Sequence, residues 1–429
     1  MSSTDPRPQV WETIPLRYVC ELNPSVAFDG LDEDEDLTFL PMERVKSGYF
    51  IPNTDKYSKY GSSYTAFEDG DIVLAKVTPC FENGNIAIAE HLVGGKGFGS
   101  SELFVIRPTT AERRFLFYYF QSTTFKQDGE ASMTGAGGLK RVSPDVLRQH
   151  HLPFPSQDTQ RFIANYLDRE TARIDGLIAE KERMLALLEE KRAALISRVV
   201  TRGLDPNVPL KPSGLEWLGE IPAHWEVQPI KYLAVVGNGS TPSVENADYW
   251  NDEGYPWLNS SVVNVSPVTS ASRFVTETAL RECHLPKIQP PAVLVGITGQ
   301  GKTRGMAAVL GVEATINQHL AFIKPRTQAL GTDYLCHLLG HAYAFLRSDS
   351  DGAGSTKGAI TCEQLANMKI PVPPRGEQIK ICARIGQALD VSMPVRLKIQ
   401  RSLDLLTERR TALITAAVTG QIPLEAMTA

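Results

Sequence analysis

The chain has 429 residues, 42% of them hydrophobic and 22% charged, which is the balance of a globular protein too long for one ordinary core. Its formal net charge of -5 excludes a globally basic nucleic-acid-binding protein, so contact with a polyanion would come from local patches. The six cysteines form no Cys-x-x-Cys pair, which predicts reduced thiols. Without a signal-peptide core or a run of ~18 apolar residues, we expect a soluble cytoplasmic protein.

Short strands separated by turn residues fill the first 152 residues, and a helix is predicted near residues 112–125. The strands are expected where apolar residues alternate, at residues 71–77, 85–89 and 103–106. Residues 153–203 then open with two prolines, repeat apolar residues at helical spacing and close at Gly203. This segment is therefore predicted to be one long helix.

The same order of elements returns after a linker rich in proline and glycine. Strands are expected near residues 292–297, 306–309 and 320–323, followed by a helix near 333–347. A second long helix is predicted from residue 371 onward, but Pro394 falls inside it. Since proline removes a helical hydrogen bond and clashes with the preceding turn, we expect a kink or a short non-helical joint there.

The two halves are copies of one another. A shift of 218 positions carries Gln160 to Gln378 and Leu188 to Leu406. The Trp-Glu-x-x-Pro-Leu-Arg-Tyr sequence that begins at residue 11 returns with an offset of 214, as Trp-Glu-x-x-Pro-Ile-Lys-Tyr. Gly135 and Lys140 return with an offset of 217, as Gly352 and Lys357. These offsets predict a tandem duplication of one unit, a globular domain followed by a long helix.

Both long helices carry an apolar heptad seam, which favours pairing with another helix. We predict that the two helices pair with each other. The residues expected at this seam are Ile174, Ile178, Leu185, Leu188 and Leu195 on the first helix and Ile399, Leu403, Leu406 and Leu413 on the second.

Residues 296–303, Gly-Ile-Thr-Gly-Gln-Gly-Lys-Thr, match the P-loop pattern and make an ATPase using Lys302 one alternative. A P-loop has to run into a helix whose N-terminus holds the phosphates, whereas residues 304–311 are typical of a returning strand. The corresponding stretch of the first copy, residues 77–84, lacks Gly-Lys-Thr. We therefore predict the tip of a β-hairpin at this position.

Other patterns that suggest chemistry have simpler interpretations. His337 and His341 lie four residues apart on a predicted helix, but no glutamate follows the first histidine, so we expect core histidines instead of zinc ligands. The acidic run at residues 32–36 is typical of a solvated loop. We predict no catalytic residue, no metal site and no cofactor in this chain.

Three features together resemble the specificity subunit of type I restriction-modification enzymes, over nearly the whole chain. They are the repeated Trp-Glu-x-x-Pro opening, the Pro-x-Pro and glutamine (Gln160, Gln378) that begin each long helix, and the segment from Lys211 to Glu226. The segment at residues 217–226 and the two helix starts are the most specific of these. In such subunits, each globular domain is a target recognition domain that reads half of a split DNA sequence.

The resemblance implies an α+β fold in which two tandem mixed α/β target recognition domains are separated by two long antiparallel coiled-coil helices, with a pseudo-two-fold internal repeat. The expected boundaries are 1–152 for the first domain, 153–203 for its spacer helix, 204–370 for the linker and second domain, and 371–429 for the second spacer helix. Two such domains would reach major-groove segments about one duplex turn, ~34 Å, apart.

The partners implied by the resemblance are double-stranded DNA, two modification (methyltransferase) subunits, and restriction/translocase subunits. S-adenosylmethionine, ATP and Mg would belong to those subunits, so this chain would bind without catalysing. A non-DNA coiled-coil adaptor is a second alternative, although it would not need two folded domains. The cations in or beside the loops expected to contact DNA, equally compatible with ordinary solvated side chains, are Lys76, Lys140, Arg141, Lys302, Arg304 and Lys357.

Overall fold

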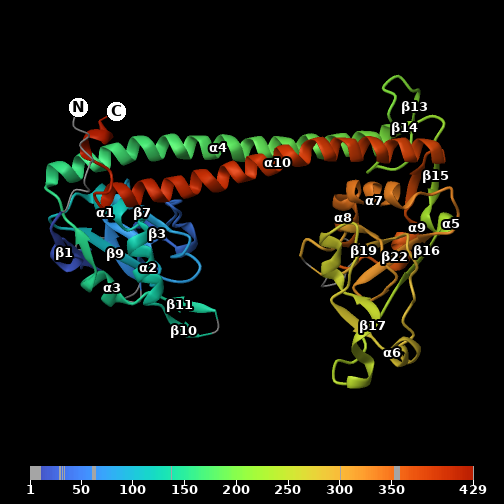
Figure 1. The fold of residues 1–429 in the computed structure, drawn as a ribbon, viewed down its shortest axis with the longest axis horizontal. Coiled ribbons are helices and arrows are strands. Elements are labelled where there is room, and N and C mark those ends of the chain that lie inside the picture. The colour runs from blue at the N-terminus through green and yellow to red at the C-terminus, as the bar shows by residue number, and fades with distance from the viewer. Residues whose placement is uncertain are drawn as a thin grey trace, which may run out of the picture. The chain divides into compact units, whose positions relative to one another are not determined.

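The structure is a computed structural model that describes residues 11–28, 30, 32, 34–59, 64–136, 138–299, 301–351 and 358–428. It forms two compact units (Figure 1): unit 1 comprises residues 1–183 and 399–429, and unit 2 comprises residues 184–398. Each long helix contributes one part to each unit. Within the described ranges, every helix is too short or too polar to cross a bilayer.

Unit 1 contains two four-stranded sheets. The first is antiparallel, in the order β2 (Cys20–Leu22), β9 (Leu103–Pro108), β6 (Ile72–Ala75) and β7 (Ile86–Ile88). The second has the order β4 (Thr54–Lys56), β3 (Asp36–Leu40), β8 (Lys96–Gly99) and β5 (Thr65–Glu68), and its central pair β3 and β8 is parallel. Strand β6 is buried on both faces because its alternate residues enter two different hydrophobic clusters, which explains its unbroken apolar sequence.

Unit 2 repeats this framework. Its main sheet has the order β16 (Ala234–Asn238), β22 (Leu320–Pro325), β19 (Ala292–Gly296) and β20 (Ala307–Leu310). Its second sheet has the order β18 (Arg273–Val275), β17 (Trp250–Leu258) and β21 (Thr315–Ile316), with β17 and β21 parallel. The pair β1 (Thr13–Pro15) and β12 (His151–Pro153) corresponds to β15 (Glu226–Pro229) and β23 (Lys369–Val372). The predicted tandem duplication is confirmed.

Two helices replace each single helix that the sequence predicted. In unit 1 these are α1 (Arg113–Tyr119) and α2 (Thr123–Ala131), because Ser122 caps the second by accepting the N–H of Phe125 at 3.4 Å. In unit 2 they are α7 (Thr332–His341) and α8 (Tyr343–Asp351).

Two hairpins also occur, β10 (Thr134–Ala136) with β11 (Leu139–Arg141), and β13 (Leu210–Pro212) with β14 (Glu220–Pro222). The remaining short elements are α3 (Pro144–Gln149), α5 (Ile230–Leu233), α6 (Glu277–Glu282), α9 (Cys362–Asn367) and the 3-10 turns η1 (Leu16–Tyr18), η2 (Met42–Arg44), η3 (Tyr57–Lys59), η4 (Val93–Gly95), η5 (Ala247–Tyr249), η6 (Ser260–Asn264) and η7 (Leu424–Met427).

The two long helices are α4 (Gln157–Arg202) and α10 (Arg375–Val418). The expected short non-helical joint is wrong, because α10 continues through Pro394, whereas the alternative of a kink stays a prediction. The proline costs the helix the N–H that would have bonded to the carbonyl of Asp390. Since Asp390 and Pro394 are both exposed, water can solvate that carbonyl, and the turns on either side keep the helix intact.

Ion pairs between α4 and α10 show how the helices pair within each unit. In unit 1, Arg410 contacts Asp175 at 2.8 Å, and in unit 2, Arg396 contacts Glu189 at 3.3 Å. From the first ion pair to the second, the residue number on α4 rises by fourteen (175 to 189) while that on α10 falls by fourteen (410 to 396). The helices are therefore antiparallel. The residues expected at the seam are buried (Ile174, Leu403) or half-buried (Ile178, Leu185, Leu188, Leu195, Ile399, Leu406, Leu413).

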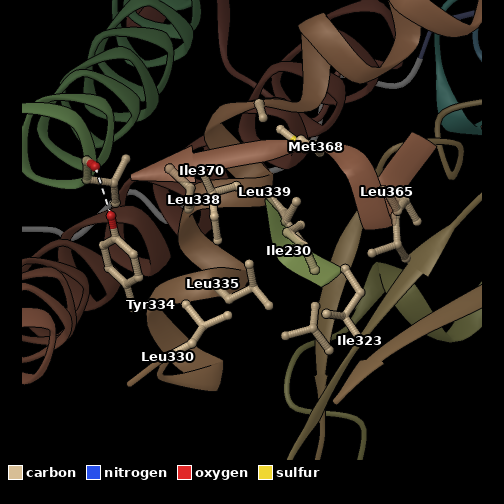
Figure 2. Packing of buried hydrophobic residues seen from close by; sticks show 14 of the residues in the cluster. Ile230, Ile323, Leu330, Tyr334, Leu335, Leu338, Leu339, Leu365, Met368 and Ile370 are labelled. Carbon is tan, nitrogen blue, oxygen red and sulfur yellow. Dashed lines mark hydrogen bonds between the residues drawn. The ribbon is translucent and has the colours of Figure 1, made fainter. Parts of the chain in front are cut away.

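The hydrophobic core of each unit joins the domain to the long helices. In unit 2, α7 packs Leu335, Leu338 and Leu339 toward Ile230 and the strands behind it (Figure 2). The fully buried Tyr334 donates its hydroxyl to the carbonyl of Val200 at 3.3 Å, which attaches α7 to the end of α4. In unit 1, α1 takes the same place, and its core side chains share a cluster with Ile163, Leu167, Ile414 and Val418 of the long helices.

Candidate nucleic-acid interface

The three cations of unit 1 that were predicted to contact DNA lie at one end of its main sheet. Lys76 follows β6 directly, and its carbonyl accepts the N–H of Val142 at 2.8 Å. The carbonyl of Lys140, on β11, accepts the N–H of Thr78 at 3.0 Å. Arg141 is the next residue of the same strand. The β10–β11 hairpin lies on the side of unit 1 away from α4 (Figure 1).

These three cations differ in how far they are neutralised. Arg141 binds Glu102 through two hydrogen bonds of 2.7 and 2.9 Å. Hydrogen bonding to Arg141 lowers the pKa of Glu102, and the charge of Lys76 adds a smaller lowering effect. Lys76 is half-buried, and its ammonium lies 5.4 Å from the ring centroid of Phe104. Lys140 is exposed and has no carboxylate partner among the described residues, so it is the best placed of the three to contact a phosphate.

The corresponding end of unit 2 is the turn between β19 and β20. These strands are antiparallel, with Val295 opposite Ala307, so the chain returns as a strand instead of entering a helix. The hairpin prediction is confirmed, and the P-loop interpretation is wrong. Lys302 is exposed in this turn, where its carbonyl accepts the Tyr343 hydroxyl at 2.9 Å. Arg347 of α8 donates to the carbonyl of Gly301 at 2.7 Å.

One of the predicted contact residues, Arg304, does not lie on this exposed tip. Arg304 is only 3% exposed, so its expected place on a surface facing DNA is wrong. The chain turns back at Gly305, whose φ is +86° and whose N–H donates to the carbonyl of Gly296 at 2.8 Å, and Arg304 therefore lies at the base of the tip. Lys357 and residues 352–354 are outside the described residues.

A polar group missed by the sequence analysis lies beside the tip of unit 2. The hydroxyl of Thr298 is 2.6 Å from His319 Nδ1, and Gln318 Nε2 is 3.3 Å from His319 Nε2. Thr241 donates to Gln318 Oε1 at 2.6 Å. Hydroxyl, amide and imidazole groups of this kind can donate to and accept from base edges. Their signal in the sequence is the polar run from Asn317 to His319 between two apolar strands.

A stacked arginine was also missed. The guanidinium carbon of Arg273 lies 3.8 Å from the ring centroid of Trp250 and 5.3 Å from the ring centroid of Trp257. A hollow of about 530 Å³ lies beside this stack, lined by residues that include Asn251 and Asp252. Stacking leaves the N–H edge of a guanidinium available, and that edge matches guanine in the major groove. In the sequence, the signal for this stacked site is the pair of tryptophans in β17.

Residues 8–183 and 222–391 match the type I restriction modification DNA specificity domain, which is more than half of the chain. The chain belongs to this family. The offset between the two matched starts, 214 (8 to 222), equals the offset between Trp11 and Trp225, so the family domain occurs once per copy.

Relatives within the specificity-domain family match stretches of this chain that differ in length and in sequence identity. The type I restriction enzyme EcoAI specificity subunit of Escherichia coli is 36% identical over 165 residues, which are 37% of this chain but only 28% of that protein. The type I restriction enzyme MjaVIII specificity subunit of Methanocaldococcus jannaschii is 20% identical over 424 residues, covering 97% and 93%. A chain solved in a study of complex assembly and conformational transition of the type I R-M system has the same fold, with a TM-score of 0.72, 20% identity and coverage of 97% and 99%.

The remaining candidates for chemistry that the sequence offered are the two histidines of α7. His337 and His341 are partly buried on α7, and burial lowers the pKa of both imidazoles. Within the part of the chain that the structure describes, no group of three or more His, Cys, Asp or Glu side chains could hold a metal ion. Burial likewise raises the pKa of Cys336 to about 11, as expected for an unreactive thiol.

Proposed function

We propose that this chain is the DNA-reading subunit of a type I restriction-modification complex, and that each unit binds one half of a split, asymmetric target. One observation carries the proposal: the same strand framework occurs twice, whereas the side chains at its equivalent exposed ends differ. The strand that ends at Ala75 in unit 1 is followed by Lys76, and the equivalent strand that ends at Gly296 in unit 2 is followed by Ile297. The turn of unit 2 also presents Lys302 beside the polar group at Gln318 and His319. Equal frameworks with unlike contact residues read unlike sequences.

The charge distribution supports this assignment. Although the chain carries a net charge of -5, Lys140 and Lys302 are exposed at the ends of the sheets. Exposed cations of this kind provide phosphate contacts that fix the register of a protein on the duplex. The hydrogen-bonding groups beside Lys302 and the stacked guanidinium of Arg273 are suited to reading base edges.

The proposal includes protein partners. Two modification subunits would supply the methyltransferase activity with S-adenosylmethionine, and restriction/translocase subunits would supply the ATP- and Mg-dependent steps, so this chain binds DNA in the cytoplasm without catalysing a reaction. Exposed apolar side chains on the long helices support docking of other subunits, because such residues favour burial in an interface. They are Leu177, Met184 and Leu187 on α4 and Ile379, Val391, Met393, Val395, Leu397 and Leu405 on α10.

Methylome sequencing of a host that expresses the chain with its cognate modification subunit tests this function. We expect methylation at one bipartite motif whose unlike halves are separated by a spacer of fixed length, and none when the chain is omitted. Methylation that does not depend on the chain, or that falls at a continuous motif, would contradict the proposal.

A further inference from the structure

An exposed tyrosine follows a cation at the same place in both units. Arg17 and Tyr18 belong to η1, and Lys231 and Tyr232 belong to α5. Tyr18 is 63% exposed and Tyr232 is 67% exposed. The guanidinium carbon of Arg17 lies 4.8 Å from the ring centroid of Tyr18, and the Lys231 ammonium lies 5.6 Å from that of Tyr232. We call Arg17–Tyr18 and Lys231–Tyr232 the repeated cation–tyrosine pairs.

The shared core does not account for these pairs. The residues just before them, Leu16 and Ile230, are fully buried and recur because each fills the same position in its core. Their backbone is also held alike, since the N–H of Leu16 donates to the carbonyl of His150 at 2.9 Å and that of Ile230 to the carbonyl of Met368 at 3.0 Å. A tyrosine that is more than 60% exposed adds little to a core, so its presence in both copies indicates a shared surface role.

The register of the main sheets places the pairs away from the candidate DNA contacts. In unit 1, Leu103 of β9 pairs with Ala75, which precedes Lys76, whereas Pro108 pairs with Cys20, two residues after Tyr18. In unit 2, Leu320 of β22 pairs with Gly296, which leads to the Lys302 tip, and Pro325 pairs with Ala234, two residues after Tyr232. Five residues of strand separate the two ends, or about 17 Å. The repeated cation–tyrosine pairs therefore face something other than a duplex held at the tips.

We propose that the repeated cation–tyrosine pairs are two equivalent docking sites, one in each unit, for two copies of the modification subunit. This inference rests on the function proposed above. Tyrosine and arginine are enriched where protein interfaces concentrate their binding energy. A hollow of about 360 Å³ beside the first pair is lined by Arg17, Glu21 and Arg148 among others, which suits a partner side chain. The partner surface would combine an apolar pocket for the ring with a carboxylate for the cation. Because the pair occurs once per unit, one chain takes two copies of one partner.

Native mass spectrometry of the full chain co-expressed with its cognate modification subunit tests the proposal. The wild type is expected to carry two copies of the partner. Tyr18→Ala and Tyr232→Ala should each weaken one site by about tenfold or more and leave one copy bound, and the double variant should retain neither. Tyr49→Ala is the matched control, because Tyr49 is 59% exposed but has no counterpart in the second copy.

Unfolding midpoints equal to that of the wild type show that the variants are folded, and Tyr18→Phe, which keeps the ring, should largely restore the first site. Two bound copies with unchanged affinity in the double variant would overturn the docking sites. Retention of both copies together with weaker DNA binding by the chain alone would assign the pairs to DNA and would also overturn them. A wild-type complex that binds two copies but methylates no split site would contradict the proposed function while leaving the docking sites supported.

Discussion

Gln160 and Gln378 occupy equivalent positions in the two copies, and each uses a buried side-chain amide to fasten a long helix to its own domain. Gln160 Oε1 accepts the backbone N–H of Glu112 at 2.8 Å, and Gln378 Oε1 accepts that of Gly331 at 2.7 Å. Each Nε2 also donates, at 2.8 Å, to the carbonyl of the proline five residues earlier. The start of each helix is thus fixed by the same hydrogen bonds, which explains why this glutamine recurs.

Replacing the buried Gln160 should lower the free energy of unfolding more than replacing an exposed neighbour. Gln160→Ala leaves the partly buried N–H of Glu112 without its acceptor, so we expect the free energy of unfolding to fall by about 1–3 kcal/mol. Urea unfolding measures this change. Gln157→Ala is the control, because Gln157 is exposed and its hydrogen bond to the Thr110 carbonyl can be replaced by water. Equal destabilisation by the two variants would contradict the role of Gln160.

A charge placed at the helix seam should be more disruptive than one placed beside it. Ile174 is 4% exposed, whereas Leu187 on the same helix is 54% exposed. Ile174→Glu should lower the free energy of unfolding by more than about 2 kcal/mol, because it loses the buried side chain and brings a carboxylate into its place. Leu187→Glu should change it by less than about 0.5 kcal/mol. Similar unfolding curves for the two variants would show that the seam does not include Ile174.

The framework could be predicted from the sequence because it is repeated. Strands such as β6 and β19 are apolar throughout, and the constant spacing of Gln160 and Gln378 makes the duplication visible in the residues alone. Local tertiary effects were harder to predict. Pro394 would break an isolated helix, but here the buried residues Ile385 and Leu403 hold the turns on either side in place. Arg304 resembles a surface cation until the turn at Gly305 places it under the tip. The stack of Arg273 on Trp250 joins residues 23 positions apart (250 to 273). The two tryptophans of β17 are visible in the sequence, but no local pattern places Arg273 on them.

Lys302 is expected to contribute to DNA binding and not to nucleotide binding. Lys302→Ala should weaken binding to the half-site read by unit 2 and reduce the slope of log K against log salt by about 1, the effect of losing one phosphate contact. Fluorescence anisotropy at several salt concentrations provides both values. Lys369→Ala serves as the control, since Lys369 is exposed on β23, outside the tip. ATP binding by the isolated chain that disappears in Lys302→Ala would overturn this prediction.

Acidification should destabilise unit 1 through His150. This imidazole lies between the Tyr119 hydroxyl, 2.7 Å from Nε2, and the Asp128 carboxylate, 2.8 Å from Nδ1. Burial lowers the pKa of His150 below its ordinary value, although Asp128 opposes the change. As the pH falls below about 6.5, the unfolded chain takes up a proton that the folded chain does not, so stability decreases until the lowered folded pKa is passed. We expect a lower unfolding midpoint at pH 5.5 than at pH 7.5, and a smaller difference in His150→Asn. An unchanged difference in that variant would exclude His150 as a source.

The most direct test of independent half-site recognition exchanges one recognition domain. Residues 11–152 are replaced by the corresponding domain of another specificity subunit, and the methylome of a host expressing the chimera with the modification subunit is sequenced. Because each unit has its own core and its own exposed sheet end, we predict that one half of the methylated motif changes while the other half and the spacer length stay the same. Changes in both halves, or in the spacer, would contradict independent recognition and would require a single composite site.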